Sequence, residues 1–176
     1  MIQNFPQRRT IRLTGYDYSQ VGLYFVTICS QDKICRFGKI VNGGLLLKEA
    51  GRIAKQCWLD IPNHFPHISL HEFVIMPNHI HSILEIMESA GANNHSPKFR
   101  PPSRTIGSAI RGFKIGVSKW FNNSSAKNFS PLQSSKSMWQ RNYYEHIIRN
   151  SRSYRNISDY IITNPCNWVD DEYYNE

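Results

Sequence analysis

The chain has 176 residues, 40% of them hydrophobic, which suits one compact domain with a real core and is too short for several. No apolar run approaches the roughly 18 residues that a membrane span needs, and the polar, basic start is unlike a secretory leader, so we expect a soluble, unprocessed protein. The four scattered cysteines indicate neither a disulfide framework nor a zinc ribbon, which favours a reducing cytoplasm.

The net charge of +8 is unevenly distributed along the chain. Residues 165–176 hold four carboxylates and no Lys or Arg, which leaves 21 basic and 9 acidic residues, a net charge of +12, in the first 164. Such a field attracts a polyanion by electrostatic steering and counterion release. Nucleic acid is therefore the leading partner, and a basic surface that only keeps the protein soluble is the alternative.

The first part of the chain is predicted to form a strand, a hairpin and a helix. Residues 21–30 are rich in β-branched and aromatic side chains, as in a strand. A hairpin follows at 36–48, because the Asn-Gly pair at its centre favours the positive φ of a tight turn. In residues 49–61 apolar positions recur at intervals of three and four, so we expect an amphipathic helix that Pro62 ends.

Two strands are predicted next, at residues 67–76 and 78–86, paired antiparallel through a turn at Pro77-Asn78. Side chains alternate across a strand, so His79 and His81 point to the same side. One divalent metal could sit between them, although two histidines in a strand are more often satisfied polar groups. Ile80, Leu84 and Ile86 form the stripe on the buried side, and Ile83 and Glu85 share the side of the histidines.

A loop is predicted at residues 88–102, followed by a helix from Ser103, as its N-cap, to about Phe121. Three glycines inside this helix, at positions 107, 112 and 116, cost roughly 1 kcal/mol each relative to Ala. Their presence predicts close approach to a neighbour, for which we favour the sheet over nucleic acid.

Residues 122–137 are rich in Ser, Asn and Lys and read as a second loop. A last strand is predicted at 143–148, and a last helix at 152–164, where Pro165 ends it. The order strand, helix, two strands, helix, strand, helix predicts an α+β fold: an antiparallel sheet with helices packed on it and a split βαβ core, as in ferredoxin-like or RNA-recognition domains.

Tyr160 and Asn164 lie four residues apart in the last predicted helix, so their side chains share one face. If that face meets the histidines, His79, His81 and Asn164 supply three neutral ligands for Mg²⁺ or Mn²⁺, with Tyr160 beside the ion as a nucleophile. The alternative is structural: Tyr160 packs with its apolar neighbours, and Asn164 is a helix-ending residue before Pro165.

Four motifs occur in order along the chain: Gly22–Thr27 (GLYFVT), Phe73–Glu85 (FVIMPNHIHSILE), Trp139–Arg149 (WQR followed by YEHIIR), and Asp159–Pro165 (DYIITNP). Together they resemble the HUH single-tyrosine transposases, specifically the branch of REP-associated tyrosine transposases. The resemblance runs from about Arg8 to Trp168, nearly the whole chain. It implies an HUH endonuclease core.

The resemblance also implies roles for four residues: His79 and His81 as paired metal ligands, Asn164 as the third ligand and Tyr160 as the nucleophile. The implied enzyme is a DNA transposase that cleaves single-stranded DNA with Mg²⁺ or Mn²⁺, forms a 5′-phosphotyrosine link and completes strand transfer. Its substrate would be hairpin, REP-like DNA with a single-stranded guide sequence, and it would need no nucleotide cofactor.

The implied protein is bacterial and cytoplasmic, associated with the nucleoid when bound to DNA, and either a monomer or a homodimer. Its expected organisation is a basic N-terminal arm at 1–20, the catalytic domain at 21–168 and an acidic tail at 169–176.

DNA contacts are expected from basic residues that meet phosphates and from aromatic residues that stack on unpaired bases. The candidates are Arg8, Arg9, Arg12, Arg104, Arg111, Lys114, Arg141 and Arg149 for phosphates, and Trp139, Tyr143 and Tyr144 for bases. For each of them a solvated or core position is the alternative.

Two other functions fit the same sequence. A non-catalytic DNA- or RNA-binding module on this fold explains the charge and the aromatic residues, and leaves the His–Tyr–Asn set to chance. A metal-dependent phosphodiesterase that activates water needs the metal site but not Tyr160, and releases a free 5′-phosphate.

Overall fold

The computed structural model describes residues 16–88, 104–128 and 137–174. The predictions for Arg8, Arg9, Arg12 and the Ser103 cap lie outside these residues, as do most of the first predicted loop and half of the second. Among the described residues, no helix is long and apolar enough to cross a membrane. The main elements are β1 (Gly22–Cys29), β2 (Gly38–Val41), β3 (Gly44–Leu47), α1 (Glu49–Leu59), α2 (Ile61–His64), β4 (Ile68–Ile75), β5 (His79–Ile86), α3 (Ile106–Asn128), β6 (Tyr144–Ile148) and α4 (Ser151–Thr163).

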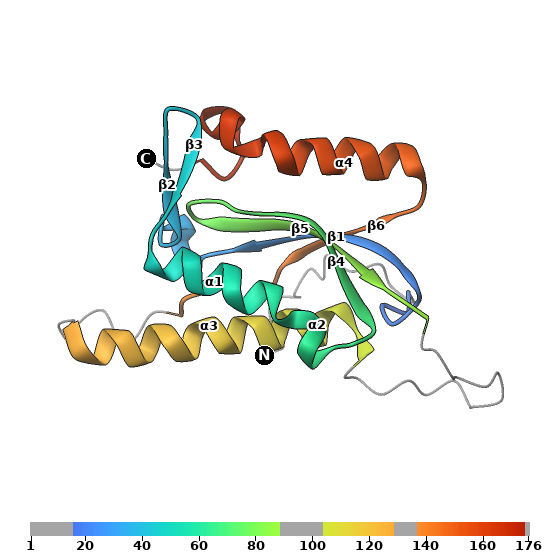
Figure 1. Cartoon of the computed structure of the whole chain (residues 1–176), viewed down its shortest axis with the longest axis horizontal. Helices are drawn as coiled ribbons and strands as arrows, with labels where there is room; N and C mark the ends of the chain where they lie inside the picture. The colour runs from blue at the N-terminus through green and yellow to red at the C-terminus, as the bar shows by residue number, and fades with distance from the viewer. Residues whose placement is uncertain (1–15, 89–103, 129–136, 175–176) are drawn as a thin grey trace, which may run out of the picture.

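The main sheet has the strand order β4-β5-β1-β6, and every neighbouring pair is antiparallel. The strands β1 and β4, which α1 connects, are therefore parallel with β5 between them, and α3 connects β5 to β6 across β1 in the same way (Figure 1). These are two interlocked split βαβ units. The predicted α+β fold with an antiparallel, ferredoxin-like sheet is confirmed.

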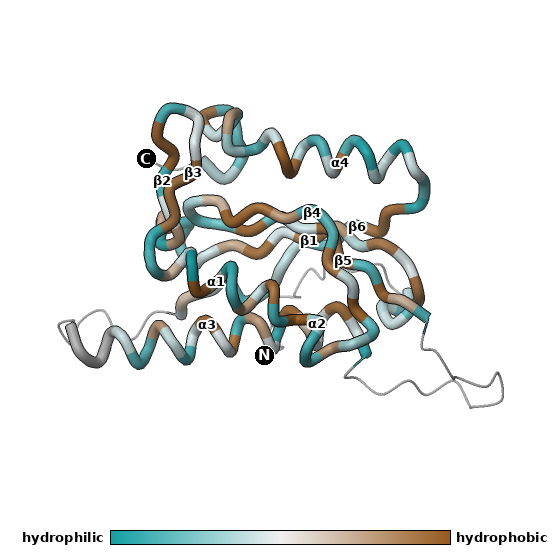
Figure 2. Tube along the Cα trace, viewed as in Figure 1, coloured by the Kyte–Doolittle hydropathy of each residue, from teal (hydrophilic) through white to brown (hydrophobic). Residues whose placement is uncertain are grey.

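Helices cover the two faces of this sheet unequally: α1, α2 and α3 lie on one face and α4 on the other (Figure 1). In β5, Ile80, Leu84 and Ile86 join the large core cluster that also contains residues of α1 and α3. Ile83 points the other way and packs with Ile161 of α4 in a second cluster. Hydrophobic stretches run along the strands between the helical layers (Figure 2). The predicted two-sided strand is confirmed, and its histidines face α4.

The helix predicted at 49–61 is in fact two helices. α1 ends at Leu59, and the short α2 begins at Ile61 with Pro62 in its first turn. A helix needs no backbone N–H from its first turn, so proline starts a helix there as readily as it stops one. The expectation that Pro62 ends the helix was wrong in this respect.

Helix α3 continues to Asn128, seven residues beyond the predicted end. Residues 122–128 contain neither Gly nor Pro, and each Ser or Asn costs less than about 0.7 kcal/mol in a helix, so the helix propagates through them. Two of the three glycines of α3 approach α1 and the residue that caps α2, not the sheet: a Cβ atom on Gly112 would meet the Phe65 ring at 3.4 Å, and one on Gly116 would meet Cys57 Sγ at 3.5 Å.

Helix α4 ends at Thr163, within one residue of the prediction, but Pro165 does not end helical structure there. A 3₁₀ segment, η4 (Asn164–Asp170), follows directly with Pro165 in its first turn. Its buried Trp168 packs near His79, with ring centroids 6.0 Å apart. This segment brings the last described residues back to the sheet.

Candidate active site

The two histidines of β5 lie side by side on the face of the sheet that α4 covers. His79 pairs with Cys29 of β1, and His81 with Thr27. Their ring centroids are 4.3 Å apart, and the exposed fractions of the two residues are 0% and 1%. Two imidazoles are thus held together inside the protein, away from bulk water.

Asn78 fixes the hydrogen position on His79. Its Nδ2 donates to the carbonyl oxygens of Lys33 (3.0 Å) and Tyr173 (2.8 Å), which identifies its other amide atom as the acceptor Oδ1. His79 Nδ1 lies 2.9 Å from this Oδ1 and must therefore donate to it. His79 Nε2 is left with a lone pair, is buried, and has no hydrogen-bond partner among the described residues.

His81 is held on both sides of its ring. Nδ1 lies 2.8 Å from Thr27 Oγ1, and Nε2 lies 3.1 Å from the Tyr160 hydroxyl oxygen. A hydrogen on Nδ1 satisfies both contacts, because Nδ1 then donates to Thr27 and Nε2 accepts from Tyr160. The Phe25 ring stacks on the imidazole with centroids 5.4 Å apart. The second histidine therefore also directs a nitrogen lone pair toward α4.

Burial makes both imidazoles poor bases. It lowers the pKa of His79 well below its usual value, with further contributions from His81 and Lys33. It lowers the pKa of His81 to about 4, although the Asp171 carboxylate opposes the shift. Both rings are therefore neutral near neutral pH, which is the form in which histidine binds a metal ion.

Tyr160 reaches His81 from α4. Asn150 caps this helix by accepting a hydrogen bond from Ser153 N (2.9 Å), and Ile157 and Ile161 pack on the sheet, which orients the next turn. Tyr160 is 41% exposed, and its hydroxyl lies 3.4 Å from Asp171 Oδ2 as well as 3.1 Å from His81. Burial and the nearby carboxylates of Asp171 and Glu172 raise the pKa of this phenol to about 12.

Asn164 lies at the end of α4, 1% exposed, and its Nδ2 donates to Asp171 Oδ2 at 2.7 Å. Its Oδ1 is buried and lacks a hydrogen-bond partner within the described part of the chain. The structure thus brings together all four residues that the sequence singled out: His79, His81, Tyr160 and Asn164. Their chemical roles stay predictions.

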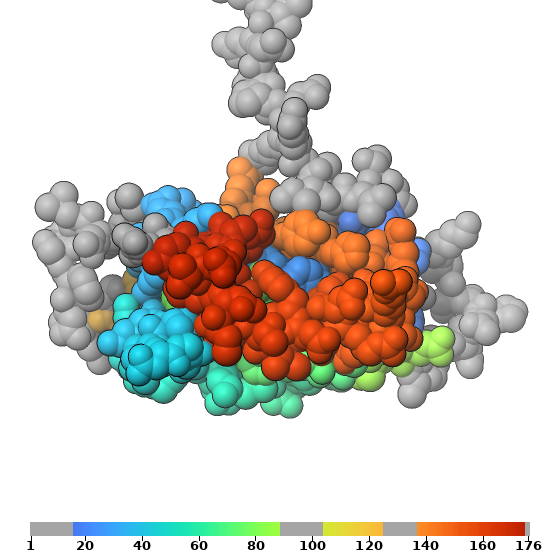
Figure 3. Space-filling view, turned by 90° about the horizontal axis from the view of Figure 1, so that it is seen from above, coloured from blue at the N-terminus to red at the C-terminus, as the bar shows by residue number. Residues whose placement is uncertain are grey.

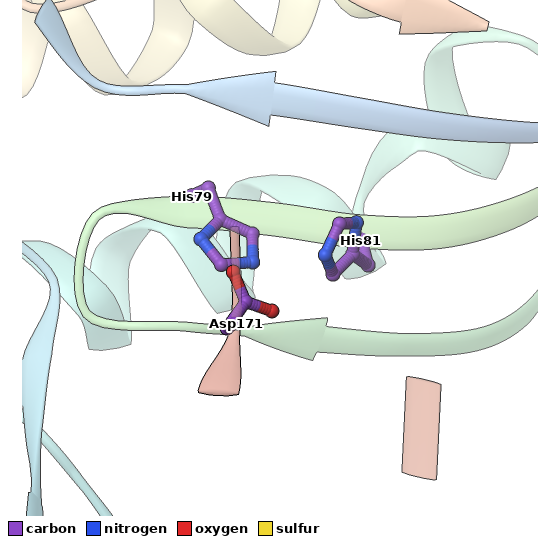
Figure 4. A group of neighbouring side chains, drawn as sticks. All are labelled: His79, His81 and Asp171. Atoms are coloured by element: carbon purple, nitrogen blue, oxygen red, sulfur yellow. The ribbon is translucent and has the colours of Figure 1, made fainter. Parts of the chain in front are cut away.

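Asp171 completes this group, although its position in the sequence predicts only a place in an acidic tail. One ring nitrogen of each histidine and one Asp171 carboxylate oxygen lie within 4.8 Å of one another. In Figure 4 both rings project from β5 to the same side, and the carboxylate reaches them from a different part of the chain. No spacing signal marks Asp171, since it follows an irregular 3₁₀ segment.

The donor set fits a divalent cation. Buried polar atoms almost always have partners, yet His79 Nε2 and Asn164 Oδ1 have none among the residues described. Both carry lone pairs, and the third group, Asp171, is an acid. Imidazole nitrogen and carboxylate or amide oxygen are ordinary ligands of divalent metals.

Residues 171–173 pack beside the histidines, with Asp171 and Tyr173 half-buried and Glu172 exposed. The ring of Tyr173 lies 4.6 Å from His79 and 5.7 Å from His81 between centroids, and its carbonyl accepts from Asn78. Lys33 Nζ donates to the Glu172 carbonyl at 2.9 Å. The start of the predicted acidic tail is therefore packed against the predicted catalytic domain; the domain boundaries themselves stay predictions.

Several of the predicted DNA contacts line one groove on the opposite side of the sheet. This groove of about 660 Å³ runs between α3 and the chain that leads into β6. Lys114 lies partly inside it, where its Nζ donates to the carbonyls of Gln140 (2.8 Å) and Asn142 (2.9 Å), and burial lowers its pKa to about 8. The lining includes Arg111, Lys114, Lys119, Arg141 and Tyr143.

Trp139 was expected to stack on bases, but it belongs to the core. It is 4% exposed, its indole Nε1 donates to the Lys114 carbonyl (3.2 Å), and its ring lies 5.2 Å from that of Phe37. A side chain so enclosed offers no face to a nucleic acid, so the stacking prediction for Trp139 was wrong. Its indole combines a large apolar surface with one polar atom, which suits a core position with a carbonyl in reach.

Tyr144 is placed differently, on the histidine side of the edge strand β6. It is 42% exposed, and its ring lies 6.2 Å from that of Phe25, which in turn lies 6.3 Å from that of Tyr160. Figure 3 looks onto this face: α4 crosses it, and parts of β1 and β6 remain visible beside the helix. Arg104 and Arg149 are exposed as well.

No protein-family model matches the sequence. An uncharacterised protein of Haemophilus influenzae is 44% identical over 175 residues, which cover 95% of this chain and 93% of the relative. A second protein of that organism, provisionally named a REP-associated tyrosine transposase, is 25% identical over 153 residues, 85% of this chain and 73% of the relative.

A REP-associated tyrosine transposase of Escherichia coli is 28% identical over 102 residues, which are 57% of this chain and 47% of that protein. The solved structure of a REP-associated tyrosine transposase bound to a REP hairpin superposes with a TM-score of 0.57 and 20% identity, over 90% of this chain and 73% of that one. At this identity the structural likeness concerns the fold.

Proposed function

The chain belongs to the REP-associated tyrosine transposases, and from this premise we propose that it cleaves and rejoins single-stranded DNA through Tyr160. One observation carries the proposal. The Tyr160 hydroxyl lies 3.1 Å from His81 Nε2, although 79 residues separate the two in sequence. A tyrosine that only packs against its apolar neighbours on α4 would not require this contact with a buried, neutral imidazole.

Tyr160 supplies the attacking oxygen. Its Oη–P bond to a 5′-phosphate forms while the P–O3′ bond of the DNA breaks, and the proton that the phenol loses balances the one that the 3′ oxygen gains. The resulting phosphotyrosine keeps the bond energy, so the same 3′-hydroxyl, or another one, can attack it and rejoin a strand. Neither hydrolysis nor a nucleotide cofactor is required.

The residues around Tyr160 orient this step. His79 Nε2, His81 Nε2 and Asn164 Oδ1 would hold Mg²⁺ or Mn²⁺ beside the phenol, and such an ion, when bound, supplies positive charge to the phosphate that is attacked. The packing of α4 on the sheet through Ile157 and Ile161 holds the phenol at one distance from these groups. Preorganisation of this kind lowers the entropic cost of attack.

The DNA path that we propose joins the basic groove on α3 to Tyr160 around one edge of the sheet. β6 is an edge strand, and it begins directly after Arg141 and Tyr143 in the groove. Tyr144 then leads onto the face that carries Phe25 and Tyr160. Phosphates of a hairpin stem would lie against the groove, and an unpaired flank would stack on Tyr144. The solved relative with this fold is bound to a REP hairpin, which supports hairpin DNA as the substrate.

The test is covalent capture. Wild-type protein and Tyr160→Phe are incubated with Mn²⁺ and end-labelled hairpin DNA that carries a single-stranded flank, and the products are separated in denaturant. We expect a denaturant-resistant protein–DNA adduct with wild type and none with Tyr160→Phe. Tyr16→Phe is the matched control, because it removes a phenol hydroxyl whose partner is the Tyr24 hydroxyl (3.3 Å) and not a group beside the histidines.

The other two functions give different results in the same experiment. A non-catalytic binding module would shift the DNA in a native gel and form no adduct. A phosphodiesterase that activates water would cleave equally well as Tyr160→Phe and leave a free 5′-phosphate. Cleavage by Tyr160→Phe at the wild-type rate would therefore remove Tyr160 from the mechanism.

A further inference from the structure

The last described segment of the chain is anchored beside the histidines at several points. Asp171 N donates to the Trp168 carbonyl (3.2 Å), and Asp171 Oδ1 accepts from Tyr173 N (2.7 Å). The Tyr173 carbonyl accepts from Asn78, and the Glu172 carbonyl accepts from Lys33. Asp171 is therefore held in a defined position and is not part of a free acidic tail.

The side chain of Asp171 points at the donor set described above. Its Oδ2 accepts from Asn164 Nδ2 at 2.7 Å and lies 3.4 Å from the Tyr160 hydroxyl. Since a carboxylate oxygen can only accept, the contact also establishes that the other amide atom of Asn164 is the oxygen, which is buried and lacks a partner among the described residues. The Asp171 carboxylate therefore lies within 4.8 Å of a ring nitrogen of each histidine and is hydrogen-bonded to Asn164, whose amide oxygen keeps its lone pairs free.

We propose that Asp171 is a carboxylate ligand of the divalent cation, together with His79, His81 and Asn164. This inference rests on the proposed function and changes its metal site: three neutral ligands become four, with one negative charge. Mg²⁺ and Mn²⁺ prefer anionic oxygen ligands, so the carboxylate supplies much of the affinity. Asn164 has a second task here, because its amide N–H holds the carboxylate in place as an outer-shell hydrogen bond does in other metal sites.

Binding of Mn²⁺ alone, without DNA, tests the proposal directly. Free Mn²⁺ is counted by its electron paramagnetic resonance signal while protein is titrated. We expect Asp171→Asn to weaken Mn²⁺ binding at least tenfold. Asp170→Asn makes the same change of charge at the adjacent, exposed position and should leave the affinity within about twofold of wild type. Equal affinities for the two variants would overturn the proposal.

A second measurement uses the wild-type chain and so does not depend on how a variant folds. In a titration with Mg²⁺ followed by ¹³C NMR, the Asp171 carboxyl carbon should shift along the same saturation curve as the His79 ring. A stationary Asp171 signal while His79 shifts would also overturn the inference. Either result leaves the adduct formed by Tyr160 untouched, so failure of this inference and failure of the proposed function can be told apart.

Discussion

At the scale of single residues, Asn78 does more than form the turn between β4 and β5. Its two donor bonds tie it to the chain on either side of the site, at Lys33 and Tyr173, and its Oδ1 then selects the hydrogen position on His79. A buried amide with three good hydrogen bonds orients its neighbour at little entropic cost. Asn78 therefore positions His79, the proposed metal ligand next to it in sequence.

Asn78→Ala should weaken Mn²⁺ binding about tenfold, because the His79 ring loses the bond that orients it and keeps Nε2 free of hydrogen. The same change should lower the free energy of unfolding by about 1–3 kcal/mol, since the Lys33 and Tyr173 carbonyls lose a donor. Calorimetric titration with Mn²⁺ and urea unfolding measure the two effects. Asn63→Ala, at an exposed position, is the control; an unchanged Mn²⁺ affinity in Asn78→Ala would contradict this role.

At the scale of elements, the close packing of α1 depends on one glycine. A Cβ atom on Gly51 would overlap the Phe37 carbonyl oxygen and lie 2.9 Å from Leu47 Cδ2, so backbone on the adjoining segment approaches the helix as far as sterics allow. Gly116 in α3 is less restricted, because a Cβ atom there would meet only Cys57 Sγ at an ordinary 3.5 Å. A methyl group therefore fits at Gly116 and does not fit at Gly51.

Gly51→Ala should lower the free energy of unfolding by roughly 3 kcal/mol, because backbone must move to admit the methyl group. Gly116→Ala should raise it by up to about 1 kcal/mol, because alanine loses less backbone entropy in a helix and here meets no obstacle. Urea unfolding of both variants checks the pair. If Gly51→Ala instead raised the free energy of unfolding and Gly116→Ala lowered it, the helices would have to pack differently in solution.

The packing of helix α4 on the sheet positions Tyr160 relative to the histidines. It touches the sheet over β4 and β5, and Tyr154 ties its first turns to β4 through hydrogen bonds to His71 (3.1 Å) and Glu72 (2.9 Å). Tyr160 lies nearly two turns further along. The rigid docking of one helix therefore sets the distance between the phenol and the histidines.

At the scale of the whole molecule, the basic groove and the histidine site are two separate surfaces, for which we propose phosphate binding and strand cleavage. The basic groove of α3 lies on one face of the sheet, and the histidine site lies on the other, under α4. The net charge of +8 would attract the proposed DNA substrate at long range, and Arg111, Lys119 and Arg141 concentrate positive charge in the groove. The proposed DNA path between the two surfaces follows the β6 edge, because Arg141 and Tyr143 of the groove lead directly into that strand.

Neutralising two groove residues should therefore reduce the salt dependence of DNA binding. For Arg111→Gln/Arg141→Gln, the slope of log affinity against log salt should become shallower by about 1.8, since each lost contact with a phosphate of the duplex stem removes about 0.9. Fluorescence anisotropy with labelled hairpin DNA at several salt concentrations measures the slope. Lys39→Gln/Lys55→Gln removes the same charge at two exposed positions outside the groove and should change it little.

The sequence by itself determined what depends on the geometry within one element. The twofold repeat of a strand places His79 and His81 opposite Ile80, and the 3.6-residue repeat of a helix aligns Tyr160 with Asn164; both follow from local backbone geometry. The same periodicities also predict the order and type of the elements, and with them the antiparallel sheet.

Only the tertiary structure decided which of these faces meet. That the Tyr160 face of α4 lies on the histidines, that Asp171 returns to them through a 3₁₀ segment, and that Trp139 is enclosed in the core all depend on contacts between residues far apart in sequence. Such contacts arise from the shape complementarity of whole packed layers, which no local repeat encodes. The candidate ligands His79 and His81 could therefore be identified from a short motif, whereas Asp171 emerged only once the chain had folded back on its own sheet.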